Sequence, residues 1–458
     1  MPNYILLERI ELNASAASVT FSNIPQTGYT DLKLVISART SQATGGAWGD
    51  LAIKFNNSTA NLTARYLYGT GSAAASATGT TIDVHGTTSS NTASTFGNVE
   101  VYIPNYTSSN FKSISIDDVT ENNATSSLTF LNAGLWSNTA AINEIAIYSP
   151  NSYSILQYST FSLYGLAAVG TTPVIAPKAS GGSVIATDGT YWYHAFRTSG
   201  TFTPATGLSC DVMVAAGGGG GGSGGGGSND GAGGGAGGFR VLTSQTLTSQ
   251  GYTVTVGGGG TSGSGARGGV GTNSSFAGSG FTTITASGGG GGATTLNSAG
   301  LAGGSGGGAA GTGGGTGTVG TGNAGSYSPV EGYAGGLGAS DGASYDNAGG
   351  GGGATAVGVA ANAAGGGAGG AGSSAYSSWA SATATGVSSA YAGGGGGAGF
   401  STKLAGAGGT GGGGAGSNGN GNNATAGTTN SAGGGGGGGI NGIGGLGGSG
   451  IVIIRYAV

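Results

Sequence analysis

The residues that could do enzyme chemistry are few in this sequence, and their spacing carries little information. Gly221 to Gly225 places Ser223 in a Gly-x-Ser-x-Gly pattern, which in some hydrolases presents a nucleophilic serine at a strand-to-helix turn. The pattern lies inside a glycine run, where such matches arise by chance. A standard phosphate-binding loop is excluded, because the only lysine beyond Lys178 is Lys403, between threonine and leucine. We therefore predict that the protein is not an enzyme.

Metal-binding chemistry has equally little support. His85 and His194 lie far apart in the sequence without histidine or cysteine neighbours, so we expect each on a strand or at a strand edge. Asp117, Asp118 and Glu121 could bind a cation, but a solvated turn is the favoured interpretation. We expect no metal and no cofactor.

The remaining candidates are aromatic residues that could bind a ligand through their ring faces. They lie in segments rich in Ser, Asn, Thr and Ala, residues 318–348 and 371–392, and a similar segment spans residues 417–432. Tyrosine and tryptophan supply rigid contact area and stack on sugar faces. The alternative is a set of polar surface loops whose rings pack on one another. The predicted receptor-binding residues are Tyr327, Tyr333, Tyr345, Tyr376, Trp379 and Tyr391.

Glycine blocks must position these segments. Only 12 of the 112 glycines lie in residues 1–180, and the other 100 lie in the remaining 278 residues. Collagen is excluded, because the sequence has 8 prolines and no strict three-residue repeat. The blocks alternate with apolar segments, so we expect a bundle of polyproline-II or polyglycine-II helices over residues 217–238 and 288–449. Such helices have three residues per turn and bond to their neighbours through the backbone.

We expect successive glycine blocks to run antiparallel, so that connectors alternate between two ends of the bundle. One set is short and apolar and is predicted to form a buried end. The long aromatic-bearing segments are predicted to form an exposed end that binds a partner. The short apolar set comprises Leu296, Leu301, Val357, Val359, Phe400, Leu404, Ile440, Ile443 and Leu446.

Ordinary strand patterns flank and precede the glycine blocks. Runs of β-branched and aromatic residues predict a small β base over residues 183–286 and 450–456, onto which the apolar connectors pack. Residues 1–168 show strand alternation, as in Leu32, Leu34 and Ile36, and predict an all-β sandwich that is jelly-roll-like. Residues 169–182 read as a linker, and residues 183–458 as the glycine-rich domain.

Strands of the first domain are expected at nine places. They are residues 4–12, 18–24, 32–36, 51–55, 99–103, 113–117, 128–135, 142–148 and 161–166. In the β base, strands are expected at residues 183–187, 191–197, 201–204, 208–216, 239–242, 252–256, 281–286 and 451–456.

Composition limits the classes of partner. The net charge is −4 and only 6% of residues are charged, so neither a nucleic-acid footprint nor a polybasic membrane surface is expected. A single cysteine, Cys210, allows no intrachain disulfide and is expected to be a buried apolar residue. Neither a signal peptide nor a membrane-spanning segment is expected.

Several stretches together resemble the glycine-rich domain of tailed-phage fibre proteins. They are Thr201 to Pro204, Cys210 to Gly222, Tyr252 to Gly260, Asn273 to Phe276 and Gly447 to Tyr456. The first domain resembles a sandwich module of phage virion proteins, most clearly at Tyr102 to Ser109 and Val119 to Thr125.

The resemblance implies a virion protein similar to tail-fibre tip adhesins, whose polyglycine-II sandwich carries receptor-binding loops. The expected partners are a host surface glycan or outer-membrane protein, together with other virion proteins bound through residues 1–168. A homo-oligomer is expected, with a trimer as the working hypothesis. The alternative is a capsid head fibre or decoration protein with a purely structural role, because no fibre-attachment module of those adhesins precedes the glycine-rich domain.

Overall fold

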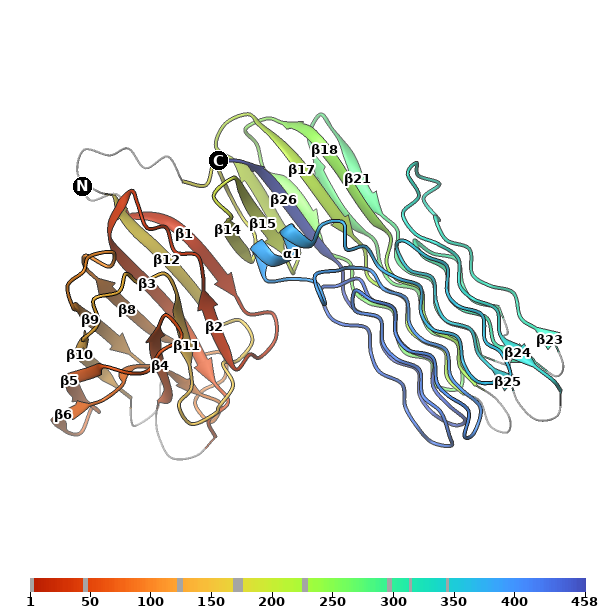
Figure 1. Ribbon diagram of the computed structural model, residues 1–458, viewed down its shortest axis with the longest axis horizontal. Helices are drawn as coiled ribbons and strands as arrows, with labels where there is room; N and C mark the ends of the chain where they lie inside the picture. Colours follow the sequence, from red (N-terminus) through yellow and green to blue (C-terminus); the bar gives the residue numbers. More distant parts are fainter. Residues whose placement is uncertain are drawn as a thin grey trace. The chain divides into compact units, whose positions relative to one another are not determined.

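The chain divides into two compact units in the computed structural model. The first unit comprises residues 1–177, 183–192 and 458, and the second, called here the glycine-rich unit, comprises residues 178–182 and 193–457. The structure describes residues 4–43, 48–121, 127–167, 176–224, 230–294, 299–312, 315–342 and 346–458. The described residues are mostly β, with large antiparallel sheets and one short helix (Figure 1).

Two antiparallel sheets make up most of the first unit. The larger has the strand order β1-β12-β3-β8-β9-β10-β5-β6, and the smaller has the order β2-β11-β4-β7. Their bounds are β1 (Tyr4–Glu11), β2 (Ser18–Phe21), β3 (Tyr29–Thr40), β4 (Gly49–Phe55), β5 (Leu62–Gly69), β6 (Ala74–Gly79), β7 (Ile82–Thr88), β8 (Gly97–Ile103), β9 (Lys112–Val119), β10 (Thr129–Trp136), β11 (Ile145–Tyr148) and β12 (Thr160–Ala167). A further strand, β14 (Val184–Thr187), pairs with β1.

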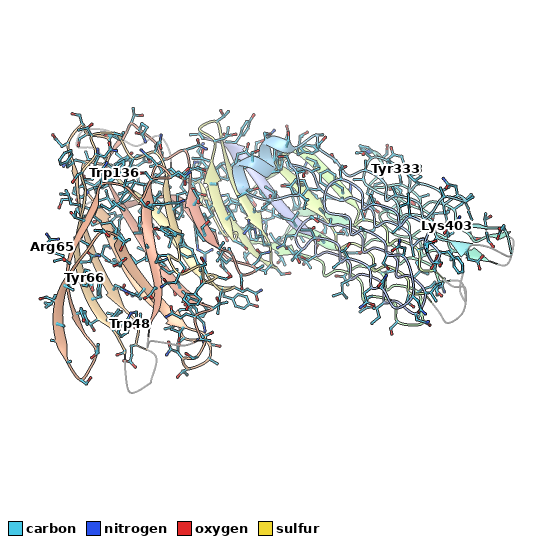
Figure 2. All side chains as sticks on the ribbon, turned by 60° about the horizontal axis from the view of Figure 1, so that its bottom comes forward. Trp48, Arg65, Tyr66, Trp136, Tyr333 and Lys403 are labelled. Atoms are coloured by element: carbon cyan, nitrogen blue, oxygen red, sulfur yellow. The ribbon has the colours of Figure 1, made fainter. Side chains whose placement is uncertain are left out.

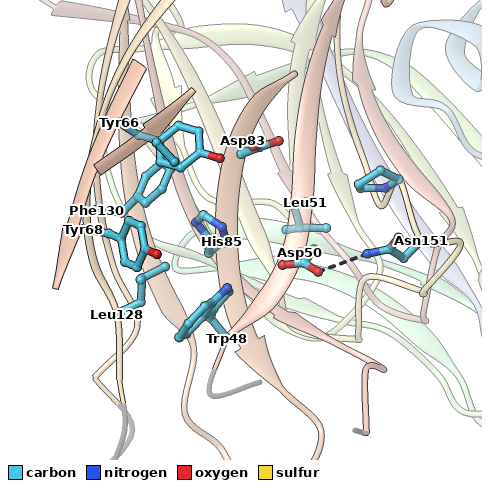
Figure 3. A pocket seen from close by; sticks show the side chains of 12 residues that line it. Trp48, Asp50, Leu51, Tyr66, Tyr68, Asp83, His85, Leu128, Phe130 and Asn151 are labelled. Atoms are coloured by element: carbon cyan, nitrogen blue, oxygen red, sulfur yellow. Dashed lines mark hydrogen bonds between the residues drawn. The ribbon is translucent and has the colours of Figure 1, made fainter. Parts of the chain in front are cut away.

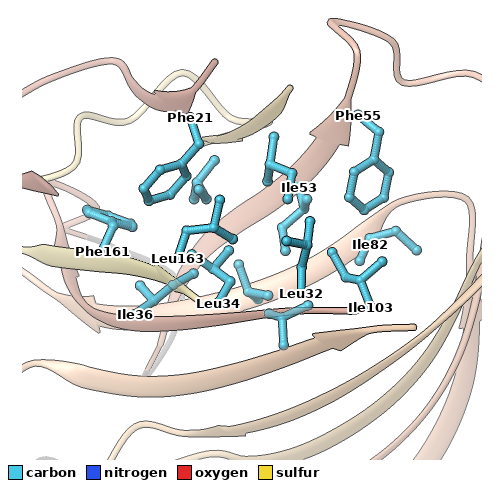
Figure 4. Packing of buried hydrophobic residues seen from close by; sticks show 14 of the residues in the cluster. Phe21, Leu32, Leu34, Ile36, Ile53, Phe55, Ile82, Ile103, Phe161 and Leu163 are labelled. Atoms are coloured by element: carbon cyan, nitrogen blue, oxygen red, sulfur yellow. The ribbon is translucent and has the colours of Figure 1, made fainter. Parts of the chain in front are cut away.

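Side chains from both sheets of the first unit share one hydrophobic core. Leu34 and Ile36 of β3 lie against Ile53 of β4 and Phe21 of β2, all with 0% exposure (Figure 4). The alternation along β3 turns every second residue toward this core, as the sequence predicts. The jelly-roll-like connectivity stays a prediction.

The glycine-rich unit contains two sheets at one end of its glycine segments. One sheet joins β15, β26, β17 and β18, and the other has the order β13-β16-β19-β20-β21. The bounds of these strands are β13 (Ala179–Ser180), β15 (Tyr191–Phe196), β16 (Gly200–Pro204), β17 (Leu208–Ala215), β18 (Phe239–Leu247), β19 (Tyr252–Thr255), β20 (Ser274–Gly278), β21 (Phe281–Ala286) and β26 (Ile451–Ala457). These two sheets are called the β base.

The remaining elements of this unit are short. The helix α1 (Ser377–Thr383) lies beside β26, whereas the two-residue strands lie at the end of the glycine segments away from β17 and β18 (Figure 1). These strands are β22 (Gly311–Thr312), β23 (Gly315–Thr316), β24 (Ala339–Ser340) and β25 (Asp346–Asn347).

Hydrogen bonds between the glycine segments repeat every three residues. Along residues 217–222, the first and fourth amides donate to residues 266–273, the second and fifth to residues 443–450, and the third and sixth to residues 230–238. The acceptors of these six amides are, in order, Thr272, Gly448, Gly235, Gly269, Gly445 and Ala232. Each segment therefore bonds in several directions around its axis, unlike a β-strand, which bonds to neighbours on two sides.

Residues 230–238 lie at the centre of this array. Their amides donate to three surrounding segments, and their carbonyls accept from three others. The donors and acceptors around them lie in residues 216–224, 287–294, 305–311, 346–353, 392–399 and 432–439. The array is thus held mainly by its backbone.

A side chain at most of these glycines would collide with the backbone of a neighbouring segment. A Cβ on Gly219 would meet the carbonyl oxygen of Gly290, and one on Gly234 would meet that of Gly219. The obstacles are main-chain atoms that cannot turn aside, so the glycines are required by close approach.

The strand predictions are largely confirmed, with specific omissions. Every strand predicted for the first domain is present, but β5, β6 and β7 are not among the predicted strands, and the β base contains the unpredicted β13 and β20. Residues 183–187, expected in the β base, contribute β14, which pairs with β1 of the first unit. The predicted boundary at residue 168 and half of the predicted linker, residues 169–175, lie outside the described residues, and the described half contains β13, which pairs with β16.

The prediction that the short apolar connectors form a buried end is wrong. Leu404 is 72% exposed, Val357 57% and Leu446 53%, and Val359 and Ile443 are also exposed. Leu301, Phe400 and Ile440 are half-buried, and Leu296 lies outside the described residues. The main reason is that the array is closed by backbone hydrogen bonds, so side chains on its outer segments have nothing to pack beneath.

Candidate functional site

The six predicted receptor-binding residues do not share one exposed surface. Trp379 is 2% exposed and Tyr391 is 0% exposed, so the prediction that these two residues lie on an exposed surface is wrong. Tyr345 lies outside the described residues. The residues that reach solvent are Tyr327, Tyr333 and Tyr376, and their binding to a receptor stays a prediction.

The segment of residues 371–392 returns to the β base instead of forming an exposed end. The ring of Trp379, on α1, lies 6.1 Å from the ring of Tyr193, and the guanidinium of Arg455 lies 4.6 Å from the Trp379 ring centroid. Phe239 and Tyr391 stack at 6.2 Å with an interplanar angle of 20°. These contacts fasten α1 and its flanking turns to the base, a structural role.

A second long segment also reaches the β base. Glu331 is fully buried; its Oε2 accepts a hydrogen bond from the amide of Ser287 at 2.8 Å, and its Oε1 accepts one from Gly325 at 2.9 Å. The guanidinium of Arg240 lies 3.6 Å from the ring centroid of Tyr327. These contacts hold the turn of residues 323–332 against the start of β18.

Connectors of a different kind meet at the opposite end of the array, called here the tip. Beside β22 to β25, which also lie at this end, the tip comprises residues 263–267, 362–364, 400–404, 418–423 and 440–443. Asn347 of β25 bonds to Asn362 and Phe400, and Asn420 forms a bridge with Ile440. Nδ2 of Asn441 donates to Oδ1 of Asn420 at 2.9 Å. Lys403 lies at this end (Figure 2). The tip therefore presents amides and a cation.

A buried carboxylic acid lies just beneath the tip. Asp230, the first described residue of the central segment, is 0% exposed, and neither of its carboxyl oxygens has a hydrogen-bond partner among the described residues. Burial, with a smaller contribution from the charge of Asp346, raises the pKa of Asp230 to about 8. Among the described residues no group of three or more His, Cys, Asp or Glu side chains could hold a metal ion.

His194 and Cys210 are buried in the β base. Nδ1 of His194 lies 2.6 Å from the carbonyl oxygen of Gly181, and its Nε2 lies 2.9 Å from the hydroxyl of Tyr456; burial lowers the pKa of His194 to about 4. Cys210 is buried as expected, and burial raises the pKa of its thiol to about 12.

The helix of the described chain is too short to cross a membrane.

The first unit contains a pocket that the sequence did not predict. It has a volume of about 410 Å³ and lies among β4, β5, β7 and β10 (Figure 3). Trp48, Tyr66 and Tyr68 are half-buried in its wall, and the side chains of Asp50 and Asp83 also face it. The remaining lining residues are Leu51, Ala77, His85, Leu128, Phe130, Pro150 and Asn151.

A buried ionisable pair lies under this pocket. Nδ1 of His85 is 2.8 Å from Oδ2 of Asp118, and the two side chains are 8% and 0% exposed. Burial raises the pKa of Asp118, and the hydrogen bond with His85 opposes that rise. The solvated-turn interpretation of Asp117 and Asp118 is therefore wrong, because both lie on β9 and Asp118 faces inward. The prediction that both histidines lie on strands is confirmed.

The pocket residues come from separate strands. Tyr66 and Tyr68, two residues apart, share one face of β5, a spacing that could have been read as a paired aromatic face. Trp48 lies just before β4, and His85 lies on β7. Only the pairing of β4 with β7, and of β5 with β10, brings these side chains together.

Comparison with known proteins gives one finding. A family model described as a glycine-rich domain matches residues 197–457, more than half of the chain. The matched segment contains the hydrogen-bonded array and most of the β base, and it leaves the main sheets of the first unit outside. No curated protein matches the chain.

Proposed function

We propose that this chain, which belongs to the glycine-rich domain family, is a structural protein of a tailed-phage virion: a tail fibre or adhesin that recognises a host-surface receptor. The proposal includes attachment to other virion proteins through the first unit and assembly as a homo-oligomer, with a trimer as the working hypothesis. The receptor is a surface glycan or an outer-membrane protein.

The glycine segments are proposed to be polyglycine-II helices. A helix with three residues per turn turns each successive amide by one third of a circle, so every third amide points at the same neighbour. The three-residue repeat of acceptors along residues 217–222 agrees with this geometry. Each such bond contributes about 1 kcal/mol net, which offsets part of the large entropy cost of ordering glycine.

The observation that carries the functional proposal is the collection of connectors at the tip. A bundle cross-linked in several directions is rigid, and loops on a rigid scaffold are a common way to build a recognition surface. The tip connectors offer amide groups at Asn420 and Asn441 and a cation at Lys403, all suited to hydrogen bonding with sugar hydroxyls or protein carbonyls. We therefore favour the tip over the predicted aromatic residues as the receptor-binding surface.

The test is binding of the full-length chain to bacteria that the phage infects. A fluorescent wild-type chain is expected to bind cells saturably and to block phage adsorption. The double variant Lys403→Ser, Asn441→Ser should lose at least tenfold in affinity. Tyr333→Ser, which changes an exposed side chain outside the tip, is the matched control and should bind as wild type.

Two results would redirect the proposal. Loss of binding in Tyr333→Ser but not in the tip variant would move the receptor site to the aromatic segments. A folded wild-type chain that neither binds cells nor blocks adsorption would contradict the adhesin and favour a capsid fibre or decoration protein.

A further inference from the structure

We infer that the pocket among β4, β5, β7 and β10 of the first unit is a binding site for an uncharged saccharide. The inference concerns residues outside the family match and does not depend on the proposed role of the glycine-rich unit. It would give the chain a ligand site in the unit that the sequence predicts only to anchor or oligomerise.

The wall of the pocket is aromatic and is held in place by ring contacts. The ring centroids of Tyr66 and Phe130 are 5.0 Å apart, and those of Tyr66 and Tyr68 are 6.3 Å apart. Trp48 meets His85 edge to face at 6.3 Å. Half-exposed rings of this kind present flat apolar faces, which suit the C–H face of a pyranose ring.

The polar groups of the pocket are mainly hydrogen-bond acceptors. The carboxylate of Asp83 accepts no hydrogen bond from another described side chain, and Asp50 accepts one from Nδ2 of Asn151 at 3.0 Å. A saccharide presents several O–H donors, and a hydrogen bond to a charged acceptor is stronger than one between neutral groups. The aromatic rings therefore suit the apolar C–H face of a sugar, and the carboxylates suit its O–H donors.

The charge of the lining narrows the ligand class. Among the residues that the structure describes, no lysine or arginine lines the pocket, whereas Asp50 and Asp83 both do. A phosphate, a sulfate or an acidic sugar would meet two carboxylates without a compensating cation, and is disfavoured. The volume of about 410 Å³ lies within the usual range of small-molecule sites.

The floor of the pocket is built to stay rigid. Leu51, Leu128 and Phe130 are no more than 4% exposed, and the ring of His85 packs against Phe130 at 4.7 Å. The bond of His85 to buried Asp118 fixes the orientation of that ring. A preformed floor of this kind lowers the entropy cost of binding a ligand.

The experiment is a binding screen of the full-length chain against uncharged oligosaccharides, including maltose, lactose and chitobiose, by saturation-transfer NMR and calorimetry. Asp83→Asn and Trp48→Ala are each expected to weaken the best ligand at least tenfold. Asp117→Asn, on the exposed face of β9, and Tyr158→Ser, at a site 60% exposed, should bind as wild type. If Trp48→Ala loses structure by circular dichroism, Tyr68→Phe replaces it, with an expected loss of about threefold.

Three results would overturn the inference. The first is the absence of binding to every saccharide of the screen. The second is binding that the pocket variants leave unchanged. The third is binding of tetramethylammonium, but of no sugar, that depends on Asp83 and Trp48, because this would identify an aromatic cage for a quaternary ammonium cation.

Discussion

In the first unit, side chains such as Leu34, Ile36 and Phe161 fill the space between two sheets, and all three are fully buried. In the array of the glycine-rich unit, the corresponding space holds main-chain atoms of neighbouring segments, and an added Cβ would strike a carbonyl oxygen. One unit excludes water with hydrocarbon, and the other does so with hydrogen-bonded backbone. The two units should therefore fail under opposite kinds of substitution: removal of atoms in the first and addition of atoms in the second.

The largest effect is expected from Gly219→Ala. The added methyl group would overlap the carbonyl oxygen of Gly290 at a position enclosed by backbone, and relief would require neighbouring segments to move. We expect the glycine-rich unit to lose more than about 4 kcal/mol of stability or to fail to fold. Hydrogen–deuterium exchange of residues 230–238, compared with exchange in the first unit, measures the effect.

The matched control is Gly258→Ala in a neighbouring glycine run. A Cβ there would meet only Oγ1 of Thr272 at 3.9 Å, an ordinary contact. Exchange close to wild type is expected for this variant. Equal protection in both alanine variants would refute the requirement for glycine at the array's interior.

A smaller effect is expected from Ile36→Ala in the first unit. Removing buried methyl groups from this core should cost about 3 kcal/mol, because the cavity closes only in part. Exchange should speed up in β3 and its partners β8 and β12. Leu404→Ala, which truncates a side chain 72% exposed in the glycine-rich unit, should change stability by no more than about 0.5 kcal/mol. A large loss in the second variant would contradict the proposed division between the two units.

A further effect, smaller than that of Ile36→Ala, is expected from Asp230→Asn. The folded pKa of about 8 exceeds the ordinary value of 3.8, so this carboxyl favours folding most below pH 3.8 and loses that contribution as pH rises toward 8. At pH 7 the asparagine variant should be more stable by about 2 kcal/mol, since the amide carries no charge but still lacks partners. Denaturant midpoints at pH 4 and pH 7 measure the difference. A gain at pH 4 equal to that at pH 7 would exclude titration of Asp230 as its cause.

The strands that the sequence predicts correctly are those in which apolar and polar side chains alternate. Alternation along β3, β8 and β9 identifies strands because every second residue faces a core. β6, with the sequence Ala-Ala-Ser-Ala-Thr-Gly, has mostly small residues and lacks such alternation, and it was missed.

The direction of the glycine segments could not be predicted, because a turn within glycine has no distinct composition. The composition of residues 303–315 is nearly uniform, yet the chain reverses at residues 303–305. Each unseen reversal changes which end a later connector reaches, so the assignment of long and short connectors to two ends failed. Trp379 was expected on an exposed loop because it is aromatic, but its large apolar ring packs against Tyr193 of the β base. The pocket of the first unit depended on strand pairings that no local pattern contains.

The central position of residues 230–238 also has a consequence for the order of events during synthesis. The hydrogen-bond partners of this segment extend to residues 432–439, which are synthesised about 200 residues later. Contacts so distant in sequence are slow to form, and a nascent chain that stops before them leaves the amides of its innermost segment without acceptors. The array should therefore assemble only after residues 432–439 have been translated, and a chain truncated before them should yield material that proteases remove.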